Sequence, residues 1–220
     1  MNLVGHVAVA VRSSPDAPPL YFAGCMLPDL AAMARVRLRP AAGELGAGVA
    51  FHHATDAAFH ASQWFNDHNV ALRDRLLDAG VDRGPARAAA HAGLEMLLDG
   101  DLADHPTVER SVVRAFRELS DGAAATMVRD LAPEQSRGEW SERLAMIGGA
   151  LDLQAYRSGD QVAQRLHRMT RGRTRIELRA DQVALVAEVL TSYRPQVVRG
   201  ADDAVAQVLA TVESSTAWSR

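Results

Sequence analysis

The sequence contains no lysine and only one cysteine, Cys25, so all of its 24 basic residues are arginines. A single cysteine excludes an intramolecular disulfide and is typical of a reducing cytoplasm. No apolar run approaches the ~20 residues of a membrane-spanning helix. Residues 3–11 are apolar but lack the basic start of a secretory signal. We therefore expect a cytoplasmic protein with no membrane partner.

Several signatures of common fold and ligand classes are also missing. The sequence has no GxGxxG motif, P-loop, CxxC pair, internal repeat or sustained period-two alternation of apolar residues. The formal net charge is -3, whereas general nucleic-acid binding needs a basic total, so no nucleic acid is expected. A length of 220 residues with 48% hydrophobic composition is sufficient for one well-cored domain. The prediction is a single all-α helical bundle over residues 1–220.

Apolar spacing and breaker residues give the predicted helices. Residues 2–11 are either the start of a helix or a short extended piece, and Pro28 either interrupts a helix over 20–34 or begins a new turn. A central helix over about 44–79 is predicted to run through residues 64–68. Further helices are predicted over 87–98, 106–119, 123–131, about 137–156, 161–170, 180–193 and 201–212. Seven of the eight histidines lie in residues 1–105, so any chemistry is expected there, while residues 106–220 complete the bundle and add a basic segment.

The strongest functional signal is a run of histidines in residues 49–60, which read VAFHHATDAAFH. On a helix, residues four apart lie nearly above one another. His52, His53, Asp56 and His60 then fall within an arc of about 100°. Imidazoles and a carboxylate on one helix face are a way for a helical protein to bind a metal. The alternative is an exposed polar face.

Three other positions extend this hypothesis, and each has a structural alternative. Asp29 lies in an apolar run, where a carboxylate is costly to bury unless it is paired, caps a helix or binds a metal. His6 is either a buried neutral histidine or a ligand. His91 and Glu95 are four residues apart on a predicted helix, so they share a face. They form either a hydrogen-bonded pair or part of a site.

Ordered motifs along residues 1–175 resemble those of the acyl carrier protein phosphodiesterases, which are helical, metal-dependent and distantly related to HD-type phosphohydrolases. The chain begins MN and has His6. Residues 24–29 read GCMLPD, similar to the family's G-x-x-L-x-D segment, and residues 48–56 read GVAFHHATD, similar to its G-[IV]-x-x-H-x-x-x-D segment. His91 lies where the family has a later histidine. Met169, Arg173 and Arg175 resemble a late M-x-x-x-R-x-R segment.

The resemblance implies an HD-like bundle that releases the 4'-phosphopantetheine group by metal-dependent phosphodiester hydrolysis. The implied core of the site is Asp29 with His52 and Asp56, and the full predicted ligand set adds His6 and His91. Of the adjacent His52 and His53, the helical register favours His52 as the ligand. Mixed imidazole and carboxylate ligands suit Mn, Fe or Zn, and Mg less well. His53, His60 or Glu95 would orient ligands or transfer a proton.

The substrate and partner predictions follow from charge and from the same resemblance. The basic run of Arg171, Arg173 and Arg175 would hold a phosphate or an acidic partner such as acyl carrier protein, or else is a solvated loop. Two positions depart from the family: His60 stands where it has a carboxylate, and Ala90 where it has an aspartate. Alternatives are therefore a hydrolase of another phosphoester, such as a nucleotide or phospholipid headgroup, and a catalytically silent helical binding protein. The oligomeric state is left open.

Overall fold

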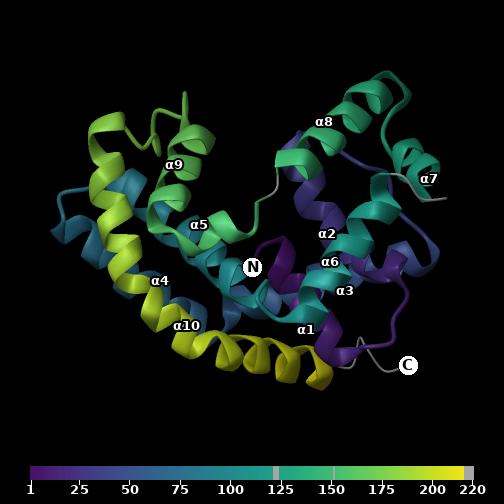
Figure 1. The fold of residues 1–220 in the computed structure, drawn as a ribbon, viewed down its shortest axis with the longest axis horizontal. Helices are drawn as coiled ribbons and strands as arrows, with labels where there is room; N and C mark the ends of the chain where they lie inside the picture. The colour runs from purple at the N-terminus through teal and green to yellow at the C-terminus, as the bar shows by residue number, and fades with distance from the viewer. Residues whose placement is uncertain (121–123, 151, 216–220) are drawn as a thin grey trace. The chain divides into compact units, whose positions relative to one another are not determined.

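The computed structural model describes residues 1–120, 124–150 and 152–215, and most of these residues are helical. Within these residues there are ten α-helices, three short 3-10 helices and no strand (Figure 1). The all-α prediction is confirmed, while an HD-like arrangement of the helices stays a prediction. In the same residues, no helix combines the length and the apolar character needed to cross a membrane.

Over the range predicted as one domain, the chain forms two compact units. Unit 1 comprises the described parts of Met1–Ala57, Asp104–Leu151 and Val212–Arg220, and unit 2 comprises Ala58–Ala103 and Asp152–Thr211. Each unit is therefore built from segments that are distant in sequence. Two helices, α3 (Gly43–Ala61) and α10 (Val183–Ser214), begin in one unit and end in the other.

Unit 1 is organised around α2 (Pro19–Ala34), which packs against α1 (Leu3–Ser13) and α6 (Pro106–Ser120). It also contains the larger part of α3, α7 (Ala124–Leu131), the 3-10 turn η1 (Glu134–Ser136) and α8 (Arg137–Ala150). Helix α1, predicted as either helix or extended chain, is buried at every position from Leu3 to Ala10. A helix that is apolar on all sides is stable only inside a core, and His6 is consequently carried into the interior.

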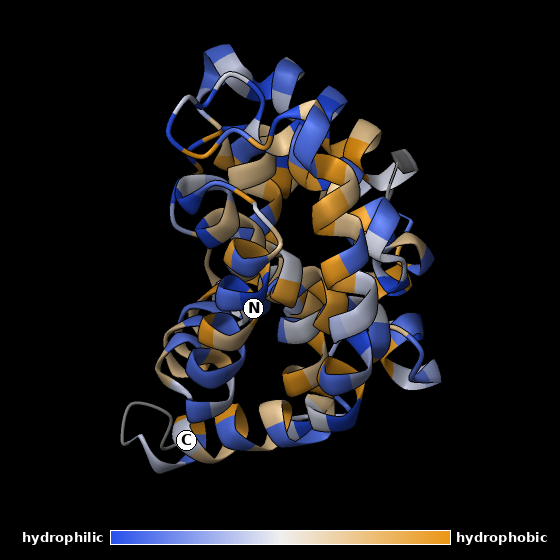
Figure 2. Cartoon of the chain, turned by 90° about the vertical axis from the view of Figure 1, so that its left-hand side faces the viewer, coloured by the Kyte–Doolittle hydropathy of each residue, from blue (hydrophilic) through white to orange (hydrophobic). Residues whose placement is uncertain are grey.

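Unit 2 is organised around α5 (Arg83–Leu102), which contacts α4 (Gln63–Asp78), α9 (Gly159–Thr170) and the 3-10 helix η2 (Gln154–Arg157). The turn η3 (Ala180–Gln182) and most of α10 complete the unit. Leu94, Leu97 and Leu98 of α5 are fully buried, as expected for the apolar stripe next to the His91–Glu95 face. Figure 2 shows apolar and polar residues alternating along individual helices, as in amphipathic helices.

Two predicted helix boundaries are wrong. The helix predicted over 44–79 is two helices, because Ser62 adopts an extended backbone and its hydroxyl accepts a hydrogen bond from the Phe65 amide at 3.1 Å, which caps α4. Conversely, the helices predicted over 180–193 and 201–212 are one, since α10 continues through Pro195. Leu190 and Val197, on either side of this proline, are both fully buried.

Helices α2 and α3 approach each other backbone to backbone at two glycines. A Cβ atom on Gly24 would lie 2.9 Å from the Gly48 Cα and 2.2 Å from the Leu45 carbonyl oxygen. A Cβ atom on Gly48 would lie 2.1 Å from the Tyr21 carbonyl oxygen. No side chain fits at either position, so these glycines set the distance between the two helices. They are also the first residues of the two motifs that contain Asp29 and His52.

Replacing Gly24 with alanine is expected to destabilise the protein by about 1–3 kcal/mol or more, because the methyl group overlaps backbone that cannot move aside. The matched control is Gly149→Ala in α8, where a Cβ atom meets nothing within 4 Å. That variant should be neutral or stabilising by up to ~1 kcal/mol, since alanine favours the helix. Urea unfolding of both variants measures the difference, and equal stability would contradict the close helix contact.

Candidate metal centre

His6, Asp29 and His52 come together inside unit 1, from α1, α2 and α3 respectively. Each offers one ligand atom, and the three atoms lie within 4.8 Å of one another. Nε2 of His6 is 4.0 Å from a carboxylate oxygen of Asp29, and the two imidazole rings have centroids 3.9 Å apart. The relative exposure is 0% for His6 and 5% for His52, whereas the Asp29 side chain is 25% exposed, so the imidazoles are buried and the carboxylate is partly accessible.

The tautomer of His52 is fixed by its hydrogen bond. Its Nδ1–H donates to the carbonyl oxygen of Cys25 at 2.8 Å, and a carbonyl can only accept. In the neutral ring, Nε2 then carries the lone pair, which is the form that binds a metal. The carbonyl lies in the α2 turn disturbed by Pro28, which cannot donate a helical hydrogen bond to Gly24. Helix α2 nevertheless continues from Pro19 to Ala34 with Pro28 inside it. The Cys25 carbonyl of this turn accepts the hydrogen bond from His52 of α3.

His6 has two possible hydrogen-bond arrangements. Its Nδ1 lies 2.7 Å from Oγ1 of Thr55 and its Nε2 lies 3.1 Å from the Met1 carbonyl oxygen. In one arrangement Nε2–H donates to Met1 and the Thr55 hydroxyl donates to Nδ1. In the other, Nδ1–H donates to Thr55, whose hydroxyl donates to the helix carbonyls of Phe51 and His52 at 2.9 and 3.0 Å. A carbonyl can only accept, so in the metal-free protein the contact with Met1 favours the first arrangement, with the hydrogen on Nε2; coordination through Nε2 would require the second.

Both histidines are uncharged at neutral pH. Burial, followed by the charge of the neighbouring His52, lowers the pKa of His6 well below its usual value. Burial also lowers the pKa of His52 to about 4, although the Cys25 carbonyl and Asp56 act in the opposite direction. Neutral imidazole is the form that coordinates metal ions. Two neutral imidazoles and one carboxylate form a donor set that fits Zn, Fe, Mn or Co.

Asp56 and His53, two other predicted residues of α3, lie in unit 1 but are not part of this group. Oδ1 of Asp56, one turn after His52, is 3.6 Å from the amino nitrogen of Met1, and its charge raises the pKa of His6. His53 is exposed and lines a pocket. The preference for His52 over His53 agrees with their burial, since only His52 turns into the core.

His91, the fifth predicted ligand, belongs to unit 2, where it neighbours His60 and Glu95. The predicted ligands are therefore divided: His6, Asp29, His52 and Asp56 lie in unit 1 and His91 lies in unit 2. No spacing along the sequence could reveal this division, because α3 itself continues from unit 1 into unit 2.

The arginines near the unit 1 group are not those predicted from the sequence. Arg171, Arg173 and Arg175 are exposed in the segment between α9 and η3 of unit 2. In unit 1, the connection from α2 to α3 supplies Arg35, Arg37 and Arg39 instead. The sequence shows these arginines in a connection rich in arginine, proline and glycine. That connection has no recognisable motif, so it gave no reason to predict a binding role.

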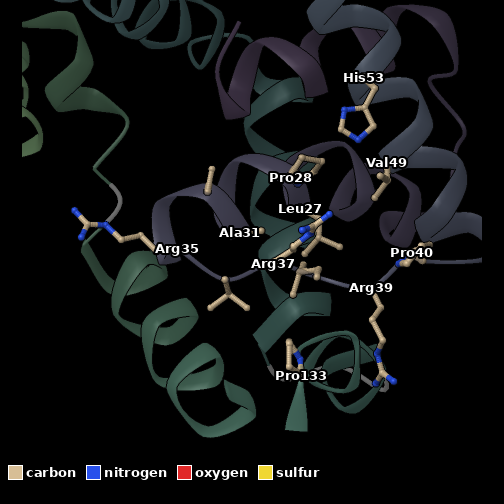
Figure 3. Close-up of a pocket in the computed structure, with 14 residues that line it drawn as sticks. Leu27, Pro28, Ala31, Arg35, Arg37, Arg39, Pro40, Val49, His53 and Pro133 are labelled. Carbon is tan, nitrogen blue, oxygen red and sulfur yellow. The ribbon is translucent and has the colours of Figure 1, made fainter. Parts of the chain in front are cut away.

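These three arginines border a pocket of about 1020 Å³ on unit 1. Its apolar lining includes Leu27, Pro28, Ala31 and Val49. Figure 3 shows Arg37 in the middle of the view beside Leu27, with Arg35 and Arg39 to either side and His53 next to Val49. Pro28 and His53, which line the pocket, are sequence neighbours of Asp29 and His52, although those two residues do not line it.

Comparisons with protein-family models, with curated proteins and with solved structures find no match to the chain.

The depressed pKa values predict how stability depends on pH. In the metal-free protein, an unfolded histidine takes up a proton near pH 6.5, whereas folded His52 does so only near pH 4. The contribution of His52 is therefore complete above pH 6.5 and falls as the pH drops toward 4, by up to about 3 kcal/mol. Chemical unfolding at a series of pH values should show this slope reduced in His52→Gln. The control His105→Gln, at an exposed histidine, should keep the wild-type slope, and a His52→Gln slope equal to wild type would contradict the burial argument.

Proposed function

We propose that the protein is a metal-dependent phosphodiester hydrolase whose reaction centre is the group of His6, Asp29 and His52 in unit 1. The observation that carries this proposal is the hydrogen bond from His52 Nδ1 to the Cys25 carbonyl. It holds a buried, neutral imidazole with its Nε2 lone pair available beside a second imidazole and a carboxylate. The ordered resemblance of residues 1–175 to the acyl carrier protein phosphodiesterases supports the same chemistry.

In this proposal His6, Asp29 and His52 are the ligands, and a bound divalent ion would activate water and neutralise charge on the phosphoryl oxygens. The Cys25 carbonyl orients His52 as an outer partner of the ligands, and Thr55 would do the same for His6 by accepting from Nδ1–H once an ion takes the place of the Nε2 contact with Met1. Asp56, which the resemblance places in the core of the site, lies close enough to influence His6 electrostatically. In the proposed site, Asp56 supplies either a nearby negative charge or a further metal ligand.

The pocket beside His53 is the proposed substrate site. Its apolar walls suit the organic part of a phosphodiester, and Arg37 offers a guanidinium, which pairs well with phosphate oxygens. His53, which is exposed and lines the pocket, would transfer a proton to or from the substrate. These features are compatible with a 4'-phosphopantetheine arm, and acyl carrier protein is the partner that the resemblance implies.

Metal binding is tested first. Purified Asp29→Asn should lose at least about 100-fold in affinity for Zn²⁺ or Mn²⁺ at one site, since a neutral amide replaces the only carboxylate of the group; even outer partners of ligands are worth 10–100-fold. The control is Asp16→Asn, an exposed aspartate of the same unit, which should bind as wild type does. Isothermal titration calorimetry gives the affinity and stoichiometry. Identical binding by the two variants would refute the centre in unit 1.

Hydrolysis is tested with two substrates, holo-acyl carrier protein and a small chromogenic phosphodiester. Arg37→Ala is expected to raise KM by about 10-fold or more, because one charge-assisted contact to phosphate is removed. Arg12→Ala, at an exposed arginine that does not line the pocket, is the control. Release of the phosphopantetheine group identifies the carrier-protein reaction, and hydrolysis of the small ester alone indicates another phosphoester. Metal binding without hydrolysis of either substrate would contradict the proposed reaction.

A further inference from the structure

Unit 2 contains a second group of imidazoles and a carboxylate, formed by His60 in the last turn of α3 and by His91 and Glu95 on α5. The Nε2 atoms of both histidines approach the same oxygen, Oε1 of Glu95, at 3.5 Å from His60 and 3.4 Å from His91. One ligand atom from each of the three residues lies within 4.8 Å of the others. None of these three residues belongs to the centre proposed for unit 1.

The two contact distances have the size of an edge of a tetrahedral metal site. Zinc–nitrogen and zinc–oxygen bonds of ~2.0–2.2 Å at tetrahedral angles place neighbouring ligand atoms ~3.3–3.6 Å apart. An octahedral Mg²⁺ site, with bonds of ~2.0–2.1 Å at right angles, would place them ~2.8–3.0 Å apart. The contacts of Glu95 with His60 and His91 fall in the first range. Imidazole ligands also favour Zn²⁺ and its neighbours over Mg²⁺ or Ca²⁺.

Aromatic packing holds the two imidazoles side by side. The rings of His60 and His91 are stacked, with centroids 4.9 Å apart and planes at 19°. The ring of Phe65 meets both of them edge-on, at 4.7 Å from His60 and 5.2 Å from His91. Phe65 is buried, so its ring is held in place by the surrounding core. The two Nε2 atoms are thereby directed at Glu95 together.

The group combines a shielded carboxylate with accessible imidazoles. The side chain of Glu95 is 14% exposed, that of His60 32% and that of His91 47%. Burial opposes ionisation of Glu95, and its hydrogen bond with His91 acts against that effect by lowering the pKa. An ion could enter from solvent, and three protein ligands would leave one tetrahedral position for water, as in catalytic zinc sites. Hydrogen bonds alone are the alternative way to hold the group together, and metal binding distinguishes the two.

We propose that His60, His91 and Glu95 form a Zn²⁺ site in unit 2, with three protein ligands and an open fourth position. The site would connect the last turn of α3 to α5. It also gives a physical role to His60, the residue that departs from the resembled family. Imidazole in place of a carboxylate changes the donor set toward the N-rich sites that Zn²⁺ prefers.

The experiment is a Zn²⁺ titration of the full-length protein by calorimetry, followed by Co²⁺ substitution read by visible absorption. Wild type should bind at unit 2 with the intense spectrum of four-coordinate Co²⁺. His91→Ala and Glu95→Gln should each bind one equivalent of Zn²⁺ fewer than wild type. The control His105→Ala, at an exposed histidine, should bind as many equivalents as wild type. Asp29→Asn should keep the intense four-coordinate signal, which makes the result independent of the centre in unit 1.

Two results would overturn the proposal: unchanged stoichiometry and affinity in His91→Ala and Glu95→Gln, or a weak, six-coordinate Co²⁺ spectrum that these variants do not alter. If either variant fails to fold, anomalous scattering at the zinc edge from crystals of the wild type decides the question without substitution. A zinc peak bonded to His60, His91 and Glu95 supports the site, and zinc-soaked crystals with no peak there refute it.

Discussion

The close contact of Gly24 with Gly48 is the constraint on which the proposed centre in unit 1 depends. Because neither glycine has a Cβ atom, α2 and α3 approach until their backbones touch. This proximity lets Nδ1 of His52 reach the Cys25 carbonyl directly. Asp29 lies a little more than one turn beyond Cys25, and Thr55 nearly one turn beyond His52. A side chain at either glycine would therefore alter the hydrogen bonds that orient both histidines.

Burial then determines the chemistry that this arrangement can support. An imidazole in the interior is costly to protonate, so burial keeps His6 and His52 neutral, which is the form that could coordinate a metal. The apolar character of α1, which carries His6 inward, and the proline in α2, next to Asp29, both contribute to ligand placement. The same environment makes the metal-free protein sensitive to acid. Burial of these two histidines would therefore both favour metal coordination and reduce stability at low pH.

The two imidazole–carboxylate groups differ in a way that predicts different behaviour. In unit 1 the histidines are buried and held by a backbone carbonyl and a threonine hydroxyl. In unit 2 they are partly exposed, stacked on each other and walled by Phe65. Solvent would therefore reach the imidazoles of unit 2 more readily than those of unit 1. Helix α3 contributes to both groups, which explains why its histidines look like one motif in the sequence.

By itself, the sequence determined the helical class, most helix positions and the residue types available for metal binding. If residues 49–60 form a helix, their spacing brings the imidazoles near one face, and α3 is that helix. Only tertiary structure decided which of them meet. His60 and His91 are 31 residues apart, and His6 is 49 residues from Thr55, so no local period relates them. The assignment of His91 to unit 2, and of Arg37 to the pocket, depends on how helices pack, because packing is set by long-range contacts that local spacing does not encode.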